Sequence, residues 1–280
     1  RVPGEVAALL GSPWWIAAGW LLCAAYVMLC ANYVAELATM LPGMGGPYVY
    51  AKRAFGELTG FVVGFSDWSL ITASLAFLGV AFGEYLGILF PELTHHTAAT
   101  ALAILLLFAL VNACGLRAGS GTQKLASVLK AMALLSFVLA CFLISPRHGD
   151  WQGAPSPASL ASIGIAVQLI IGTYGGWNAP VYFAAEDRDP GRNLPRSLFS
   201  GVLVVTGLYL LVNAALLYAL PAAQLRTSIL PAAAALQLFF GGVSGTIATM
   251  LALVLLLSII NAGMLTTPRV LPGLRRDRLL

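Results

Sequence analysis

The stretch that decides the fold is residues 170–178, which read IIGTYGGWN in the middle of an otherwise apolar segment. Three glycines, Gly172, Gly175 and Gly176, fall within five residues, and Pro180 follows shortly after them. Each glycine costs a helix about 1 kcal/mol relative to alanine, so a helix is expected to break here. A break at membrane depth frees backbone groups that lipid cannot satisfy, so these groups must face protein, water or a polar ligand. The alternative is a tight crossing of two helices at small residues.

The composition places this segment in a membrane protein. The chain of 280 residues is 59% hydrophobic and 9% charged, with a mean hydropathy of +0.88. Soluble domains are about 25% charged, so a soluble enzyme or a nucleic-acid-binding protein is excluded. The sequence has no GxxxxGK[ST] motif of a nucleotide-driven pump and no HExxH or GxSxG motif of a hydrolase. We therefore expect a carrier that is not an enzyme.

The hydropathy pattern predicts an all-α polytopic membrane fold in a single domain, residues 1–280. Polar or Pro/Gly-rich linkers separate the apolar stretches, and no linker is long enough to hold a second domain. Each stretch can cross about 30 Å of hydrocarbon as a helix. After a partial segment, Arg1–Leu10, we predict seven complete spans: Trp14–Leu41, Phe61–Phe90, Thr97–Cys114, Leu125–Ile144, Ser162–Ala184, Ser197–Leu220 and Leu236–Leu265.

Charged and aromatic residues indicate how these spans lie in the membrane. Eleven Lys and Arg residues lie in the connections on one side, whereas only Arg147 and Arg226 lie on the other. The positive-inside rule then places the C-terminal end of the chain in the cytoplasm. On this count Arg1 begins outside or within the membrane, and we expect at least one upstream span. Aromatic belts are expected at span ends, where the sequence has Trp14, Trp15, Trp20 and Trp68.

The stretch YGGWN, together with AEDRDPGRNLPRSL, resembles the sixth helix and following loop of the amino acid–polyamine–organocation superfamily. The likeness is greatest to its L-type amino acid transporter branch and the bacterial relatives of that branch. Residues 33–65, YVAELATMLPGMGGPYVYAKRAFGELTGFVVGF, resemble the family's second helix, its PxxGGxYxY loop and the start of its third helix. The NACG stretch at 112–115 and the Gln123…Lys130 pattern resemble its fourth-to-fifth helix region, and NAGMLTTPR at 261–269 resembles the end of its eighth helix. On that pattern, most of the first helix and everything beyond the eighth are absent from this chain.

The resemblance implies a fold of two inverted five-helix repeats, whose first and sixth helices are broken around a substrate site. It implies that Gly175 and Gly176 permit the break and that carbonyl groups near it receive the substrate's ammonium group. The carboxylate would be bound by the first helix. Many relatives carry a bulky aromatic gate where this chain has Gly172, so a roomier pocket is expected. The substrate-binding set implied is Gly172, Thr173, Tyr174, Gly175, Gly176, Trp177 and Asn178.

A lysine inside the predicted span Leu125–Ile144 is the candidate coupling residue. Lys130 costs about 2.5–3.5 kcal/mol at such a depth, so it is expected to face a cavity or a partner. The aligned lysine of proton-coupled and exchanger relatives stands in for a sodium ion, so the resemblance implies a bridge from Lys130 to the first and eighth helices. Candidate partners on the eighth are Ser258, Thr266 and Thr267. The alternative is a lysine that snorkels to the interface.

Charged residues near the cytoplasmic ends of the spans are candidates for an inner gate. Glu36 and Glu186 carry the negative charges of this set. Their predicted partners are Arg53, Arg188 and Arg196. Ion pairs at a membrane surface are often only structural, which is the alternative for this set.

No metal or cofactor is expected. His95 and His96 are adjacent in the stretch PELTHHT, and His148 lies in another loop, without the spacing of metal ligands. Asp67 and Glu84 lie about 25 Å apart along one predicted helix, so they cannot form a catalytic pair of carboxylates. Asp67 is expected to cap a helix or to bind a loop arginine.

The sequence as a whole favours a secondary transporter of amino acids in the inner or plasma membrane, working by alternating access. If Lys130 acts as proposed, the driving force is proton symport or exchange. The expected partners are an amino acid, protons and membrane lipid, with no nucleic acid. One alternative is a polyamine or organocation permease of the same superfamily, and another is a truncated membrane protein that does not transport. The particular amino acid, the oligomeric state and any accessory subunit stay open.

Overall fold

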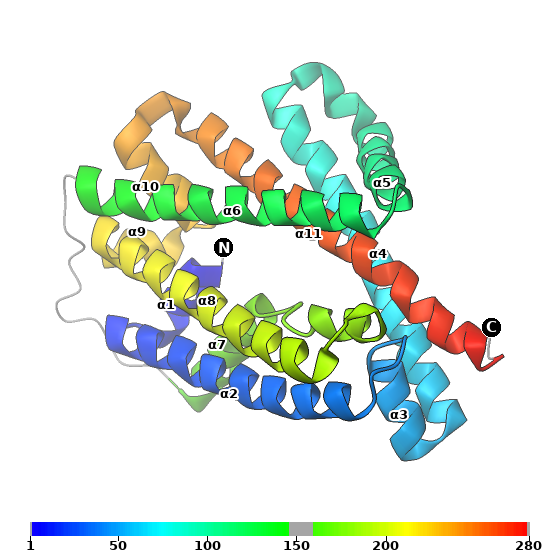
Figure 1. Ribbon diagram of the computed structural model, residues 1–280. Coiled ribbons are helices and arrows are strands. Elements are labelled where there is room, and N and C mark those ends of the chain that lie inside the picture. The colour runs from blue at the N-terminus through cyan, green and yellow to red at the C-terminus, as the bar shows by residue number, and fades with distance from the viewer. Residues whose placement is uncertain (1, 146–158, 279–280) are drawn as a thin grey trace. The chain divides into compact units, whose positions relative to one another are not determined.

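The computed structural model describes residues 2–145 and 159–278, and all the regular elements in those residues are helices (Figure 1). Arg147 and His148 lie outside the described residues. In chain order the elements are α1 (Val2–Leu10), α2 (Pro13–Met40), α3 (Pro47–Phe55), α4 (Glu57–Leu89), η1 (Pro91–His96), α5 (Thr97–Ala113), α6 (Leu116–Ile144), α7 (Leu160–Thr173), η2 (Ala179–Glu186), α8 (Pro190–Ala219), α9 (Ala222–Thr227), α10 (Pro231–Phe240), η3 (Gly241–Val243) and α11 (Ser244–Arg276).

Six helical segments of the described chain are long and apolar enough to cross a membrane. They are Pro13–Met40, Glu57–Leu89, Pro91–Ala113, Ala118–Ile144, Pro190–Ala219 and Pro231–Arg276. The protein is therefore an all-α polytopic integral membrane protein, which confirms the predicted fold class. The remaining predicted span, Ser162–Ala184, is divided into the shorter apolar helix α7 and the 3-10 helix η2.

Two other predicted spans have different boundaries in the structure. Helix α6 begins at Leu116 instead of Leu125, because the polar residues of its first turns hydrogen-bond to neighbouring helices. The predicted span Leu236–Leu265 is interrupted, since α10 ends at Phe240 and the glycines that follow do not continue it. Helix α11 then runs from Ser244 to Arg276, beyond the predicted end at Leu265.

The chain forms two compact units, and each is described by itself. Unit 1 comprises Arg1–Tyr33, Met132–Asn178 and Ser197–Ala248, and unit 2 comprises Val34–Ala131, Ala179–Arg196 and Thr249–Leu280. The long helices α2, α6, α8 and α11 contribute residues to both units. The chain also passes from unit 1 to unit 2 directly after Asn178, within the glycine-rich segment.

In unit 1, the short helix α1 packs against α7 and α9. Val6 and Ala7 of α1 and Ile170 of α7 are completely buried. At the end of α1, Arg226 of α9 donates a hydrogen bond from Nη2 to the carbonyl oxygen of Gly11, at 2.5 Å. These contacts hold the segment before α2 against the helix that carries the break.

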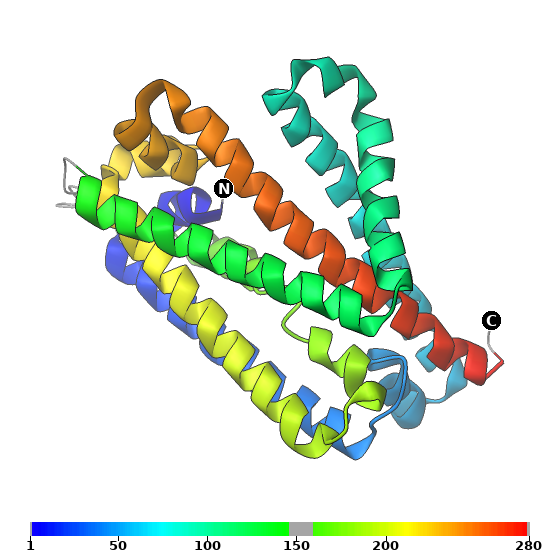
Figure 2. The same cartoon turned by 45° about the horizontal axis from the view of Figure 1, so that its top comes forward.

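In unit 2, α5 runs back along α4, and both views of the chain show the two helices side by side (Figures 1 and 2). Helix α3 packs on the first part of α4. Side chains of α4, α5 and α11 form a common hydrophobic core, in which the buried residues are Leu75, Ile104, Phe108 and Ile260. This core connects α11 to the α4–α5 pair.

Candidate functional site

The predicted break in the apolar helix is present in the structure. Helix α7 ends at Thr173, and regular structure resumes only at Ala179 as η2. Gly176 has a φ of +88°, in the left-handed region that side-chain-bearing residues rarely adopt. A Cβ atom at Gly175 would lie 3.3 Å from the carbonyl oxygen of Gly172, which is a tight contact. The two glycines therefore permit a turn that other residues would strain.

The carbonyl groups at the end of α7 have donors within the chain. The hydroxyl group of Thr173 donates to the carbonyl oxygen of Ile170 at 2.6 Å. The hydroxyl group of Tyr209, on α8, donates to the carbonyl oxygen of Thr173, also at 2.6 Å. Turn hydrogen bonds from the next backbone N–H groups reach the carbonyl oxygens of Ile171 and Gly172. Because a carbonyl oxygen has two lone pairs, each can still accept a second donor.

Three aromatic rings of unit 1 support this end of the helix. Tyr174 is 3% exposed, and its ring meets that of Tyr209 edge-on, with centroids 5.2 Å apart. The ring of Trp20, on α2, lies 5.0 Å from that of Tyr209 and 6.3 Å from that of Tyr174. Tyr174 is therefore a buried supporting residue, and its proposed place in an open side-chain pocket is not supported. Trp20 is also buried, so its predicted place in an interfacial belt is wrong.

The exposed part of the broken segment consists mainly of glycines. Gly172, Gly175 and Gly176 are exposed, and Trp177 and Asn178 are half-buried. A Cβ atom at Gly172 would meet no atom within 4 Å. The space beside this residue is open, in keeping with the small residue that the sequence places there.

An ion pair joins η2 to α11 within unit 2. Arg269 donates from Nε and Nη2 to the two carboxylate oxygens of Glu186, at 2.8 and 3.0 Å. The guanidinium carbon also lies 4.2 Å from the centroid of the Phe183 ring. The structure therefore pairs Glu186 with Arg269, which was not among the predicted partners Arg53, Arg188 and Arg196, because α11 stays helical past Leu265 and carries Arg269 to the end of η2. Glu36, the other predicted acidic gate residue, is exposed.

A buried amide network connects α5, α6 and α11 in unit 2. Asn261, which is completely buried, donates to Gln123 Oε1 at 2.9 Å and to the carbonyl oxygen of Gly119 at 3.2 Å. It accepts a hydrogen bond from Asn112 Nδ2 at 3.1 Å. Gln123 Nε2 lies 3.5 Å from Ser258 Oγ, at the limit of a hydrogen bond. Hydrogen bonds of this kind join helices where lipid offers no partner.

Comparison with known sequences shows which family the chain belongs to. Residues 2–280 match the profile of a family described as amino acid permease. The chain belongs to the amino acid permease family. Among proteins similar to it, the serine/threonine exchanger SteT of Bacillus subtilis (strain 168) is 27% identical over 277 residues. The b(0,+)-type amino acid transporter 1 of Mus musculus is 31% identical over 208 residues, and the Asc-type amino acid transporter 1 of Homo sapiens is 28% identical over 263 residues.

The chain spans only part of each of these permeases. The SteT alignment covers 96% of this chain and 61% of the exchanger. The b(0,+)-type alignment covers 70% of this chain and 42% of the relative. The Asc-type alignment covers 82% and 49%, respectively.

In this chain, Lys130 lies deep within α6 and is half-buried. The hydroxyl groups of Thr266 and Thr267 donate to carbonyl oxygens one turn earlier in their own helix, both at 2.8 Å. Ser258 is near Gln123 instead. Within the residues that the structure describes, no hydrogen bond joins Lys130 to any of these three hydroxyl groups. The coupling role of Lys130 stays a prediction.

The other charged residues and histidines considered in the sequence form a local hydrogen bond or are exposed. Asp67 accepts a hydrogen bond from the Tyr182 hydroxyl group at 2.7 Å, so its predicted arginine partner is replaced by a tyrosine of η2. Glu84, His95 and His96 are exposed.

Sequence reasoning missed several residues of this site. Tyr209 lies in an apolar run of α8, and nothing in its neighbourhood distinguishes it from a lipid-facing tyrosine. The sequence did offer a signal for Asn261, because an asparagine inside a membrane span needs a hydrogen-bond partner on another helix. Arg269 follows a proline in the quoted NAGMLTTPR motif, but its partner depends on where α11 ends.

Proposed function

We propose that this protein transports amino acids across a membrane by alternating access. The observation that carries the proposal is the end of α7 at Thr173, followed by exposed glycines, inside an apolar segment. Non-helical backbone at membrane depth is tolerated where it is buried in protein or lines a cavity. The ends of broken helices present dipoles that attract charged groups. A zwitterionic amino acid carries both the charges that such ends recognise.

The names of the similar proteins support this substrate class. They describe a serine/threonine exchanger and two amino acid transporters. We propose that the substrate's ammonium group binds carbonyl oxygens at the end of α7, in their free acceptor positions. Gly172, Gly175 and Gly176 bring the substrate close to the backbone, and Trp177 and Asn178 contact its side chain. Thr173 and Tyr174 position the segment.

The test is counterflow of radiolabelled serine by the full-length protein in proteoliposomes, followed by competition with a panel of amino acids. A Gly172→Phe variant fills the open space beside the break, so it should lower transport of large neutral amino acids more than transport of serine. Gly164→Phe is the matched control, because Gly164 is also on α7 and a Cβ there meets no atom within 4 Å. Competition by polyamines but by no amino acid would contradict the proposal.

The proposed driving force is exchange or proton symport, with Lys130 as the coupling residue. Its depth in α6 supports this role, since a buried cation needs a function or a partner. Lys130→Ala should abolish uptake or remove its pH dependence, whereas Lys124→Ala, an exposed lysine of the same helix, should not. Wild-type uptake and pH dependence in Lys130→Ala would remove Lys130 from the mechanism.

The proposed location is the plasma or inner membrane, with the C-terminal end of the chain in the cytoplasm. Eleven basic residues at one side of the spans predicted from the sequence support this orientation. A cysteine introduced as Arg278→Cys should react with a membrane-impermeant maleimide only after the cells are permeabilised. Labelling in intact cells would reverse the orientation.

A further inference from the structure

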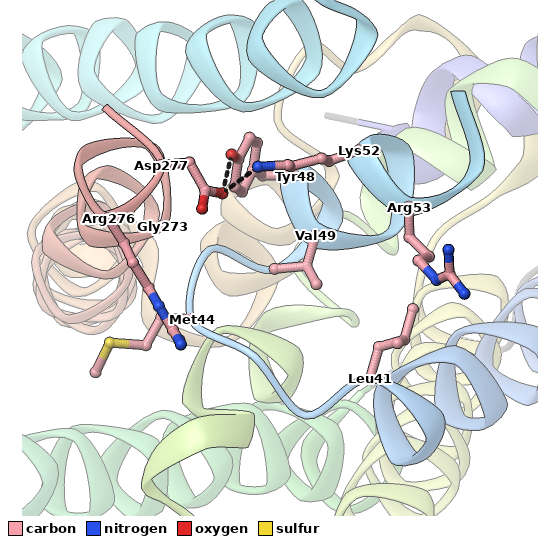
Figure 3. Close-up of a pocket in the computed structure, with 9 residues that line it drawn as sticks. All are labelled: Leu41, Met44, Tyr48, Val49, Lys52, Arg53, Gly273, Arg276 and Asp277. Atoms are coloured by element: carbon pink, nitrogen blue, oxygen red, sulfur yellow. Dashed lines mark hydrogen bonds and ion pairs between the residues drawn. The ribbon is translucent and has the colours of Figure 1, made fainter. Parts of the chain in front are cut away.

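A pocket of about 450 Å³ lies in unit 2, beside the ends of two membrane-length helices. Leu41 follows the last residue of α2, and Asp277 follows the last residue of α11, and both line the pocket. Helix α3, which connects α2 to α4, forms a further wall (Figure 3). The pocket therefore lies where membrane-spanning segments end, at the level expected for lipid headgroups.

One wall of the pocket is fixed by a buried tyrosine. Tyr48 is 1% exposed and donates a hydrogen bond to Asp277 Oδ2 at 2.5 Å. Lys52 Nζ lies 2.8 Å from the same oxygen and 3.5 Å from Glu57. The Lys52 ammonium group and the Tyr48 hydroxyl group lower the pKa of Asp277 below its ordinary value, so this carboxylate is charged and already paired. Gly273 lets α11 approach the loop before α3, which brings Asp277 beside Tyr48.

Two arginines that line the pocket take no part in the ion pair between Lys52 and Asp277. Arg53 of α3 and Arg276 of α11 are exposed, and Figure 3 shows them on opposite sides of the pocket. Within the described part of the chain, neither forms a hydrogen bond or a salt bridge. A guanidinium group binds phosphate through two parallel hydrogen bonds, and a pair of them suits a phosphodiester. The lining residues carry three positive charges, on Lys52, Arg53 and Arg276, against the one negative charge of Asp277, so the pocket has an excess of positive charge.

The space between the two arginines is apolar. Leu41, Met44 and Val49 line it, and Val49 lies between the arginines in the view of Figure 3. A small soluble anion gains nothing from such a wall, whereas the glycerol and first acyl carbons of a lipid would bury apolar surface there. Basic pockets of this kind near the membrane surface bind acidic lipid headgroups.

We propose that this pocket binds the phosphate headgroup of an anionic membrane phospholipid, with Arg53 and Arg276 as its ligands and Leu41, Met44 and Val49 against its glycerol region. The pocket shares no residue with the broken segment, and the proposal does not depend on amino acid transport. Lys52 is held by Asp277 and contributes to the field of the pocket without binding the phosphate directly.

Native mass spectrometry of the full-length protein in detergent tests the proposal. Dioleoylphosphatidylglycerol is titrated against dioleoylphosphatidylcholine, and the affinity for the first bound lipid is measured. We expect a clear preference for phosphatidylglycerol, which the double variant Arg53→Gln/Arg276→Gln lowers about thirtyfold, since each basic residue contributes about 1 kcal/mol near a lipid surface. The double variant Lys124→Gln/Arg275→Gln is the matched control, because it removes two exposed positive charges that do not line the pocket.

The results of this titration distinguish a phospholipid ligand from a soluble anion. Equal affinity of the wild-type protein for both lipids, or an equal loss in the control variant, would overturn the proposal. Displacement of phosphatidylglycerol by an excess of inorganic phosphate would also overturn it, because the site would then take soluble anions. Retention of the lipid under that excess supports it.

A second variant keeps the test independent of any folding defect in the first. Asp277→Asn removes the only carboxylate among the described residues that line the pocket, while an amide can still accept the Tyr48 hydrogen bond. The loss of this negative charge should tighten phosphatidylglycerol binding about fivefold. An affinity that does not rise contradicts the proposed binding of an anion.

Discussion

The hydroxyl group of Tyr209 lies 2.6 Å from the carbonyl oxygen of Thr173, the last residue of α7. The last carbonyl groups of a helix have no partner within the helix, and in a membrane they find none in lipid. A tyrosine from α8 supplies the missing donor and leaves the second lone pair of the oxygen free. The broken end is therefore arranged by the protein itself, which lowers the cost of ordering it around a ligand.

Replacing this tyrosine tests that arrangement. Tyr209→Phe leaves the carbonyl group of Thr173 without its donor, which should cost about 1–2 kcal/mol of stability. It should also weaken substrate affinity, because the end of α7 becomes less ordered. Thermal unfolding in detergent and a substrate-binding titration measure the two effects. Tyr33→Phe, at an exposed tyrosine of α2, should change neither, and an unchanged Tyr209→Phe would show that the hydrogen bond is dispensable.

The conformation of Gly176 leads to a second prediction. Gly176→Ala places a Cβ atom in open space, so any effect comes from its φ of +88°. The strain should cost about 1–2 kcal/mol and shift the turn after α7, with loss of transport. Gly201→Ala, on an exposed position of α8, provides the comparison and should be neutral or slightly stabilising. Both variants are assayed for unfolding temperature and uptake, and equal behaviour of the two would mean that the turn tolerates side chains.

The buried amide network of Asn261 leads to a third prediction. Asn261→Leu removes hydrogen bonds to α5 and α6 and leaves buried amide groups without partners, so it should destabilise the protein by about 1–2 kcal/mol. Asn213→Leu is the control, because the buried Asn213 donates to the carbonyl oxygen of Tyr209 in its own helix. Unfolding in detergent should rank Asn261→Leu as the more damaging. The reverse order would contradict the importance of the interhelical bonds.

The ion pair of Glu186 and Arg269 is suited to a double-mutant cycle. The side chains of Arg269 and Glu186 are 16% and 26% exposed, and their guanidinium and carboxylate groups share two hydrogen bonds. We expect Glu186→Gln and Arg269→Gln to be coupled by about 1 kcal/mol in unfolding experiments. Asp187 hydrogen-bonds to Asn193 instead, so Asp187→Asn and Arg269→Gln should act independently. Coupling that is no larger than in this second cycle would rule out a specific pair.

The contact of α3 with the end of α11 should depend on pH in one direction. Asp277 has a lowered pKa because Lys52 and Tyr48 stabilise its charged form. A carboxyl group of this kind stabilises the folded state above its unfolded pKa, and the contribution is lost as the pH falls through the lower folded value. Hydrogen exchange of α3, corrected for its intrinsic rate, should therefore be constant between about pH 5 and 8 and increase only in stronger acid. Asp277→Asn should remove that acid phase, and an acid phase that persists would assign it to another group.

Much of the fold followed from local sequence, and the misplaced boundaries show where this ended. Helix α2 starts one residue before the predicted Trp14 and ends one before Leu41, because an apolar stretch with polar ends defines its own length. Helix α6 starts earlier than predicted, since its polar first turns are satisfied by Asn261 of a distant helix. A hydropathy pattern does not show a hydrogen-bond partner that lies more than a hundred residues away in the sequence.

By itself, the sequence determined that this chain is a helical membrane protein and where the apolar segment before Ala179 breaks. Composition indicates whether a chain lies in water or in a membrane, and a glycine changes the conformation of its own backbone. Neither property depends on contacts with residues distant in the sequence. The tertiary structure decided which side chains contact the broken segment and which form ion pairs and hydrogen bonds at the ends of the helices. It placed Tyr209 on the open carbonyl group, Arg269 on Glu186, and Tyr48 and Lys52 on Asp277. Each of these contacts joins residues far apart in the chain, and their positions depend on how helices pack in three dimensions.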